Sequence, residues 1–185
     1  MGYGDGIVCL ASIETVERSN RASVIGPLNE ANAGRAARLV IEGVLFRLQM
    51  FIVRAFDRPF ADDDRNLRAA IDFLRVPGRI DEEYHETRRE DLRRAVILFD
   101  QAKADPRLKG LRYMRNKLMA HMAVHDGNKL PIPKYDDLFG FTRLTCEIWE
   151  RLSFGAGTIM IELDHQVDAY RESADVFWSK WETES

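Results

Sequence analysis

The sequence lacks any long uncharged apolar run. Its most hydrophobic stretch is interrupted by Glu42, Arg47 and Arg54, so no uncharged segment reaches the roughly 18 residues that a membrane-spanning helix needs. The N-terminus has no basic segment before its short apolar run and carries Asp5, so we expect no cleaved signal peptide. The sequence therefore argues against an integral membrane protein and predicts a cytoplasmic one.

Cysteine is scarce, and nothing in the sequence forms a metal or nucleotide motif. Cys9 and Cys146 lie far apart without a C-x-x-C pair, which predicts neither a zinc site nor a disulfide framework. His121 and His125 have a zinc-compatible spacing of four, but Met122 stands where a metalloprotease motif has Glu. No glycine-rich segment leads into G-K-S or G-K-T. We therefore expect no metal and no cofactor.

Charge of neither sign dominates. The chain has 185 residues with 27 basic and 30 acidic side chains, a net charge of −3, which argues against nucleic-acid binding through bulk charge. With 45% apolar and 31% charged residues, it suits one globular domain over residues 1–185. One segment has a local basic excess that would attract RNA phosphates, although an idle charged surface is the alternative. This segment carries Arg107, Lys109, Arg112, Arg115 and Lys117.

Apolar residues recur with helical period along most of the chain, and no segment alternates with the period of a strand. Caps and breakers predict helices over residues 29–57, from 62–64 to about 76, 81–104, 105–124, from 136 or 137 to about 155, and a last stretch through 159–177. Residues 1–27 show only a weak helical pattern. The predicted class is all-α, an antiparallel bundle of about five to six helices.

The 105–124 helix carries the most informative segment. Asp105 and Pro106 form a favourable helix start, an N-cap followed by a proline at the first position. At about 100° per residue, Arg115 and His121 flank the two sides of one apolar stripe. The stripe consists of Leu108, Leu111, Met114, Leu118 and Met122. Such a stripe would suit a packing seam that brings polar groups of two subunits together across a twofold axis.

Residues 115–121 read R-N-K-L-M-A-H. This segment, late in a small all-α chain, resembles the R-x(4–6)-H signature of the HEPN superfamily, in particular its abortive-infection and toxin–antitoxin branch. An asparagine directly after the arginine and an alanine directly before the histidine strengthen the resemblance. Arg79 and His85 have the same spacing, but Pro77-Gly78 precedes them and the Asp81 cap falls between them, so that pair straddles a turn.

The resemblance implies a HEPN-like bundle that forms a homodimer through the helix of Arg115 and His121. It also implies a metal-independent endoribonuclease in which both Arg–His pairs meet in the interface cleft. Such an enzyme would act as a toxin or abortive-infection effector in bacterial defence, with an antitoxin protein as a possible partner. In one HEPN branch a tyrosine lies two residues after the histidine, whereas this chain has Ala123, which argues against regulation through that tyrosine.

The residue types fit this chemistry. Metal-free RNA cleavage needs a base for the ribose 2′-OH, an acid for the departing 5′-oxygen and positive charge on the phosphorane. His121 titrates near neutral pH and suits the base or acid, and the Arg115 guanidinium can hold two phosphate oxygens. Asn116 would orient either group, and Arg112 and Lys117 would contact RNA phosphates. DNA lacks the 2′-OH and would not be cleaved.

A noncatalytic reading of the same residues remains open. Arg115 would then be a surface arginine whose stem covers apolar neighbours, and His121 a hydrogen-bonded interface histidine. The protein would be a helical dimerisation or interaction module, because a fold does not establish an activity.

Overall fold

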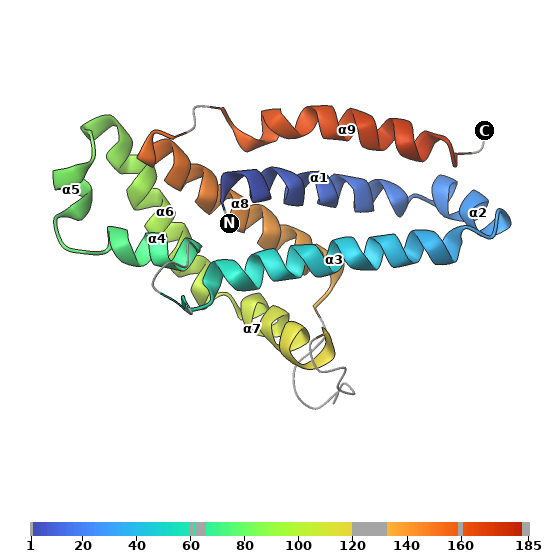
Figure 1. Cartoon of the computed structure of the whole chain (residues 1–185), viewed down its shortest axis with the longest axis horizontal. Helices are drawn as coiled ribbons and strands as arrows, with labels where there is room; N and C mark the ends of the chain where they lie inside the picture. The colour runs from blue at the N-terminus through green and yellow to red at the C-terminus, as the bar shows by residue number, and fades with distance from the viewer. Residues whose placement is uncertain (1, 60, 62–65, 120–132, 159–160, 183–185) are drawn as a thin grey trace.

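The computed structural model describes residues 2–59, 61, 66–119, 133–158 and 161–182 (Figure 1). Every regular element in these ranges is helical, which confirms the all-α class. In chain order the elements are α1 (Tyr3–Ser19), α2 (Ala22–Glu30), α3 (Gly34–Phe56), α4 (Leu67–Leu74), α5 (Arg79–Glu83), α6 (Glu86–Ala104), α7 (Pro106–Tyr113), the π-helix η1 (Met114–Met119), α8 (Tyr135–Ala156) and α9 (Leu163–Ser179). Among the described residues, no helix is both long enough and apolar enough to cross a membrane.

The bundle is elongated, and its longest helices set its axis. α1, α3 and α9 run along that axis, while α8 passes behind α1 at an angle (Figure 1). α9 packs on α1, and α8 packs on α1, α3 and α6. The short helices α4 and α5 lie with α6 at one end, and α2 joins α1 to α3 at the other. α7 projects from the body of the bundle beside the C-terminal half of α3, so the predicted site segment lies at its edge.

Aromatic packing fixes the C-terminal end of α3. The ring of Phe56 stacks on Phe99 of α6 with centroids 4.9 Å apart, and it meets Phe141 of α8 edge-on at 5.5 Å. All three side chains are at most 1% exposed. Such aromatic pairs add to the stability that comes from burying their area. They hold α3, α6 and α8 together one residue before Asp57, which matters for the site below.

Residues 2–27 are more regular than the weak pattern of the N-terminal segment indicated, because most of them lie in α1 and α2. α1 buries Cys9, Ile13 and Val16 against the core. At its start, the Tyr3 hydroxyl donates to the Ile161 carbonyl at 2.5 Å and accepts from the Gln166 amide at 2.7 Å. These bonds tie the beginning of α9 to α1, so the N-terminal helix is part of the bundle.

The predicted helix over residues 29–57 ends where expected but begins later. α2 continues to Glu30, and α3 begins only at Gly34. Asn32 between them has a φ of 56°, in the left-handed region that asparagine tolerates better than most residues. The helical period cannot report a single residue that reverses the chain, so this boundary was wrong.

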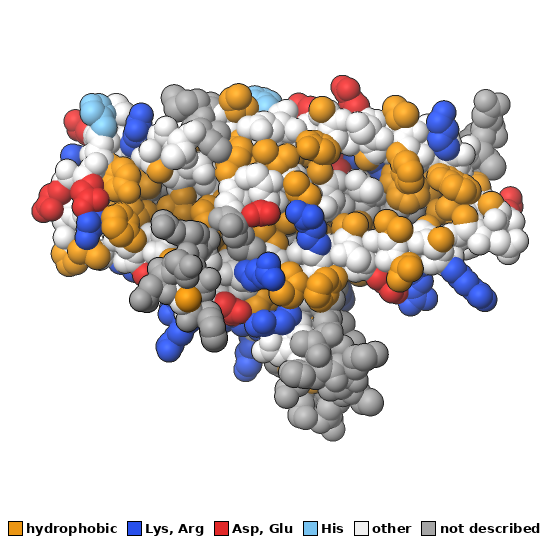
Figure 2. Space-filling view, viewed as in Figure 1, with side chains coloured by type: hydrophobic (Ala, Val, Ile, Leu, Met, Phe, Trp, Pro, Cys, Tyr) orange, Lys and Arg blue, Asp and Glu red, His pale blue; other side chains and the backbone are white. Residues whose placement is uncertain are grey.

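Apolar residues in the first half of that predicted helix also have a different environment from those in the second half. Val40 is 66% exposed, whereas Leu48 and Phe51 are buried in the main core. At this end a second, smaller cluster joins α2 to α9 through Leu28 and Trp178. Figure 2 shows hydrophobic side chains gathered on the surface over the same ends of α3 and α9.

The predicted helix over residues 81–104 is two helices. Asp81 lies inside α5 and does not cap a helix, and Tyr84 has an extended backbone. His85 is the N-cap of α6, and its Nδ1 accepts from the Thr87 N–H at 3.4 Å. The predicted end at residue 104 is confirmed. Sequence reasoning missed the break because histidine is not among the usual capping residues.

The predicted N-caps of two other helices, α7 and α8, can be compared with the observed ones. At α7, Asp105 is the N-cap as predicted, and its carboxylate accepts from the Arg107 N–H at 2.8 Å. At α8, the N-cap is Lys134, whereas Asp136 and Asp137 were predicted to cap. Asp137 instead accepts from the Lys134 N–H at 3.1 Å. Both acidic residues therefore stabilise the first turn from inside the helix, where negative charge is favoured.

Candidate functional site

The segment that was predicted to form one α-helix over residues 105–124 changes its winding. α7 ends at Tyr113, and the chain continues as the π-helix η1 from Met114 to Met119. A π-helix bonds each N–H to the carbonyl five residues back, and such turns occur frequently at functional sites. Arg115 and Asn116 therefore lie on a π-turn. The prediction that residues 114–119 follow one another around the helix axis at the α-helical value of about 100° per residue was wrong.

Arg115 meets a carboxylate from a distant part of the chain. Its Nη2 lies 3.0 Å from Oδ2 of Asp57, the residue that ends α3, and its side chain is 28% exposed. Arg112 approaches the other oxygen of the same carboxylate, with Nε 3.5 Å from Oδ1. One carboxylate thus lies between two guanidinium groups. We call these three residues, Asp57, Arg112 and Arg115, the Asp57 cluster. The cluster keeps a net positive charge.

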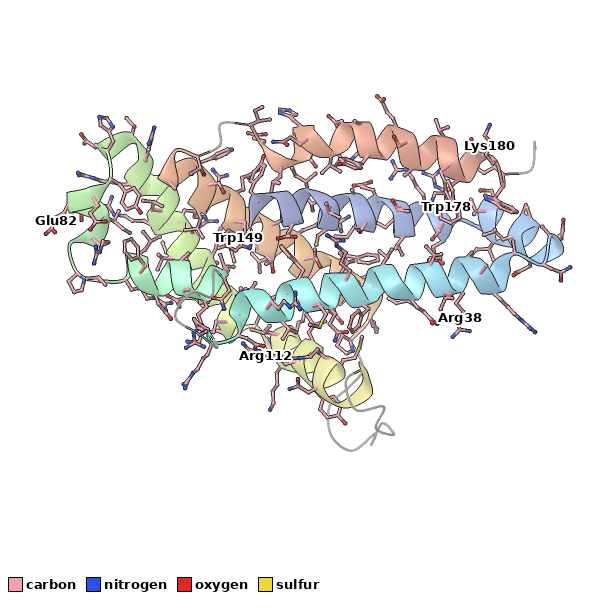
Figure 3. The ribbon with its side chains drawn as sticks, viewed as in Figure 1. Arg38, Glu82, Arg112, Trp149, Trp178 and Lys180 are labelled. Atoms are coloured by element: carbon pink, nitrogen blue, oxygen red, sulfur yellow. The ribbon has the colours of Figure 1, made fainter. Side chains whose placement is uncertain are left out.

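The end of α3 explains why the cations gather here. The carbonyl of Phe56 accepts from Nη2 of Arg112 at 2.7 Å, and the carbonyl of Asp57 accepts from the Asn66 amide at 3.2 Å. Carbonyls at a helix C-terminus have no partners within their own helix and carry the negative end of its dipole. Figure 3 shows Arg112 where α7 meets the end of α3. Arg112, predicted to contact RNA phosphate, therefore also closes the C-terminus of α3.

The other predicted site residues are placed only in part. Asn116 is exposed on η1. Lys117 belongs to η1, but its side chain lies outside the described residues, as does the whole of His121. The pairing of Arg115 with His121 and the homodimer cleft therefore stay predictions.

The apolar stripe of the motif helix has a partner within the chain. Leu108 is 2% exposed and Leu111 is fully buried, and both belong to the main core. α7 contacts α3, α6 and α8. This half of the stripe was predicted to suit a seam between subunits, but it packs inside one protomer. A dimer would have to use another face of α7.

Sequence reasoning missed Asp57 as a member of the site. It identified the residue only as the end of a helix, because 58 positions separate it from Arg115. One signal was present in the sequence: the acidic residue at a predicted helix end offers a partner to the local basic excess that starts at Arg107. The spacing alone cannot say which arginine it meets, because that depends on how α7 crosses α3.

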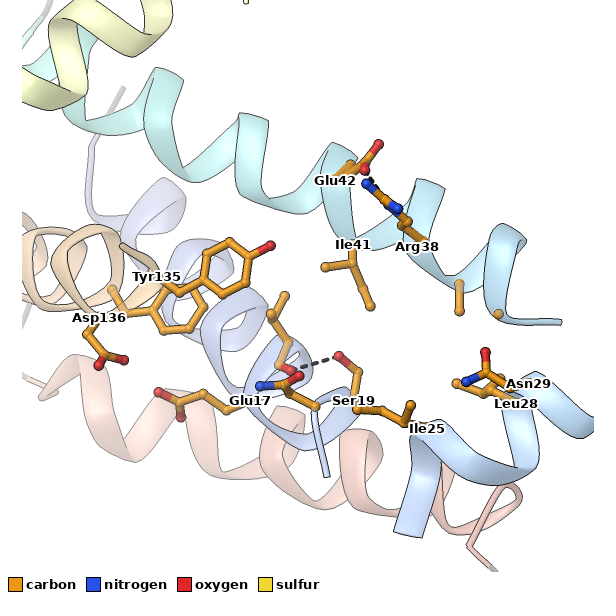
Figure 4. A pocket seen from close by; sticks show the side chains of 15 residues that line it. Glu17, Ser19, Ile25, Leu28, Asn29, Arg38, Ile41, Glu42, Tyr135 and Asp136 are labelled. Atoms are coloured by element: carbon orange, nitrogen blue, oxygen red, sulfur yellow. Dashed lines mark hydrogen bonds and ion pairs between the residues drawn. The ribbon is translucent and has the colours of Figure 1, made fainter. Parts of the chain in front are cut away.

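One cavity of the described structure lies away from the predicted site residues. It has a volume of 550 Å³ and is bounded by α1, α2, α3 and the start of α8 (Figure 4). Among the polar groups that line it, Arg38 pairs with Glu42 at 2.8 Å and the Ser19 hydroxyl donates to the Val16 carbonyl. No residue predicted for the site lines it. The Asp57 cluster, which contains the arginine of the predicted motif, is therefore the candidate site.

Among the described residues, no group of three or more His, Cys, Asp or Glu side chains is arranged to hold a metal ion. The chemistry available at the Asp57 cluster is that of two guanidinium groups, which bind anions such as phosphate through several N–H donors in a fixed plane.

Comparison with known proteins gives one family. The HEPN_AbiU2 family, described as AbiU2, matches residues 12–182. No curated protein and no solved structure matches the chain. The family match extends from α1 past the end of α9, so it includes nearly the whole helical bundle. The chain therefore belongs to the AbiU2 family, in the abortive-infection branch of the HEPN superfamily.

Proposed function

We propose that this AbiU2-family chain is a metal-independent endoribonuclease that acts as a homodimer, as a toxin or as an abortive-infection effector. The Asp57 cluster carries the proposal. It presents the Arg115 guanidinium partly exposed and held by a carboxylate, directly before the exposed Asn116. A guanidinium has five N–H donors, and Asp57 engages only part of that set, so phosphate oxygens can still be bound.

In the proposed reaction, His121 of one protomer removes the proton from a ribose 2′-OH. The 2′-oxygen then bonds to the adjacent phosphorus, and the bond from phosphorus to the 5′-oxygen breaks. The departing oxygen takes a proton from His121 of the partner subunit. Arg115 stabilises the negative charge that builds on the phosphorane, where preorganised donors have their largest effect. The products end in a 2′,3′-cyclic phosphate and a 5′-hydroxyl.

The remaining predicted residues support binding. Arg112 lies on the same carboxylate as Arg115, so a phosphate that reaches one guanidinium is also near the other. Asn116 orients His121 or the RNA from the next position on the π-turn, and Lys117 adds positive charge. Each ion pair between one of these cations and an RNA phosphate releases counterions from the RNA. The affinity for RNA should therefore fall as the salt concentration rises. An antitoxin protein that covers this surface would block the activity.

The decisive experiment incubates the purified protein with mixed RNA and, separately, with DNA in EDTA. We expect cleavage of RNA only, with 2′,3′-cyclic phosphate ends. His121→Ala should abolish it. Arg115→Lys should lower the rate by about 10- to 1,000-fold, because an ammonium cannot replace the planar fork that holds two oxygens.

Matched variants separate a specific loss from damage to the fold. His165→Ala changes an exposed histidine of α9, and Arg143→Lys changes an arginine that pairs with Glu17 at 2.9 Å far along the chain from the cluster. Both should cleave RNA like the wild type. Cleavage that survives His121→Ala, or that needs a divalent metal, would contradict the proposed mechanism. A folded wild-type dimer without RNA cleavage would favour the noncatalytic interaction module.

A further inference from the structure

A buried glutamine contacts the backbone where α7 gives way to η1. Gln49 lies on α3 and is fully buried. Its Nε2 donates to the carbonyl oxygen of Leu111 at 2.7 Å, a contact between positions 62 residues apart. Its Oε1 is buried and has no hydrogen-bond partner among the described residues. The side-chain amide therefore makes one hydrogen bond among the described residues, and its acceptor is a backbone oxygen of the site segment.

The position of this contact gives it a consequence for Arg115. In an uninterrupted α-helix, the Leu111 carbonyl accepts from the N–H four residues later, which is the N–H of Arg115. Here the Met114 N–H bonds to the carbonyls of Gly110 and Leu111, and π-winding begins at Met114. A side chain that inserts into the hydrogen-bond ladder is a recognised cause of such irregularities. Gln49 thus competes with Arg115 for one carbonyl at the point where the winding changes.

The burial of Gln49 is unfavourable for stability by itself. A buried polar atom without a partner costs free energy, because it loses its bonds to water and gains none. Methionine has nearly the same length and volume and no such atom, so the core would accept it at this position. The chain therefore keeps an amide where an apolar residue would pack at least as well, which points to a role in holding Leu111.

We propose that Gln49 is a positioning residue for the Arg115 site. Its bond to the Leu111 carbonyl favours the change from α- to π-winding and so sets the direction in which the Arg115 side chain leaves the backbone toward Asp57. The effect on RNA cleavage rests on the proposed function, whereas the effect on the winding of residues 111–119 does not. The two parts can be tested separately.

The structural part is tested by NMR on isotope-labelled protein. The wild type should show a scalar coupling across the hydrogen bond between Nε2 of Gln49 and the carbonyl carbon of Leu111. In Gln49→Met, the backbone shifts of residues 111–119 should move toward ordinary α-helical values, and the melting temperature should stay the same or rise. Absence of the coupling, or a Gln49→Met protein with unchanged shifts in residues 114–119, would overturn the proposal.

The catalytic part uses the same variants with RNA. Misplacement of a group by about 1 Å can cost a hundredfold in rate, so Gln49→Met should cleave RNA about 10- to 100-fold more slowly. The matched control is Thr145→Val, which removes a fully buried hydroxyl whose bond to the Phe141 carbonyl stays within α8; it should retain the wild-type rate. Wild-type cleavage by Gln49→Met would remove the positioning role even if the winding changes. If the wild type cleaves no RNA, the proposed function fails while the NMR result still decides what Gln49 does.

Discussion

At the scale of single residues, Asp57 holds two guanidinium groups and contributes little to folding. Its carboxylate and the Arg115 side chain are 36% and 28% exposed, and ion pairs with this much exposure are worth at most about 1 kcal/mol. Asp57→Asn should therefore change the free energy of unfolding by less than about 1 kcal/mol. It should slow RNA cleavage by about tenfold or more, because the neutral amide no longer holds the Arg115 guanidinium in place through an ion pair.

Urea unfolding and initial cleavage rates of the same preparation check this prediction. The matched control is Asp91→Asn, which breaks a comparable pair with Arg151 at 3.0 Å on α6 and α8. The control should lose a similar small amount of stability and no activity. Equal rates for Asp57→Asn and the wild type would show that the carboxylate is a bystander. A gain in rate would show that it competes with phosphate for the arginines.

The residues of the site differ in how far the sequence could reveal them. Arg115 and Asn116 could be singled out because a short local pattern contains them. Asp57 and Gln49 act through contacts with positions 58 and 62 residues away, which no local pattern encodes. Gln49 did leave a trace, since it lies four residues after the buried Leu45 and thus on the buried face of α3. A polar residue on the buried face of a helix indicates a specific hydrogen-bond partner, but only the structure identifies that partner.

At the scale of helices, two glycines should respond oppositely to the same substitution. A Cβ on Gly155 of α8 would lie 2.5 Å from the buried Leu92 side chain of α6 and 3.1 Å from its backbone nitrogen, whereas a Cβ on Gly43 of α3 would meet nothing within 4 Å. Gly43→Ala should raise the free energy of unfolding by up to about 1 kcal/mol, because alanine favours a helix. Gly155→Ala should lower it by about 1–3 kcal/mol, because the α6–α8 contact must open.

Thermal and urea unfolding of the two variants measure these changes. Both substitutions add one methyl group to a helical glycine, so any difference in sign comes from the surroundings. Stabilisation by Gly155→Ala would mean that α6 and α8 can shift apart at low cost. That result would contradict the close packing of these two helices.

The helices themselves were largely predictable, and their junctions were not. Period and capping residues located the ends at residues 57 and 104 and the start at Asp105, where strong local signals exist. The missed junctions depend on backbone states that single residues adopt in context, such as the left-handed Asn32 and the extended Tyr84. The π-turn at Met114 belongs to the same class, because the sequence pattern of residues 114–119 is compatible with ordinary α-helix.

At the scale of the whole molecule, two buried thiols make the fold sensitive to alkaline pH. Burial raises the pKa of Cys9 to about 12 and raises the pKa of Cys146 well above its ordinary value. Both side chains lie in the main core, at 1% and 2% exposure. An unfolded thiol titrates near 8.5. Above that pH the unfolded chain releases protons that the folded chain keeps, so it binds fewer protons and the stability falls as pH rises.

The size of this effect follows from the pKa shifts. Below about pH 8 both states keep the thiol protons, and the thiols add no pH dependence. Above about pH 8.5 each thiol lowers the free energy of unfolding by up to about 1.4 kcal/mol per pH unit. From pH 7.5 to 9.5 the wild type should therefore lose roughly 3 kcal/mol more than a protein without these thiols. The Tyr3 pKa is also raised by burial, which adds a loss of the same sign at higher pH.

The comparison protein is the double variant Cys9→Ala and Cys146→Ala, followed by urea unfolding at both pH values with reductant present. Its cavities lower its stability at pH 7.5 by the loss of buried volume, but that loss is the same at both pH values. Only the slope therefore reports the thiols, and every other titrating group is common to both proteins. Parallel slopes would mean that solvent reaches the thiols in the folded state. A steeper wild-type slope would instead show that the helices around Cys9 and Cys146 exclude water as a single packed core.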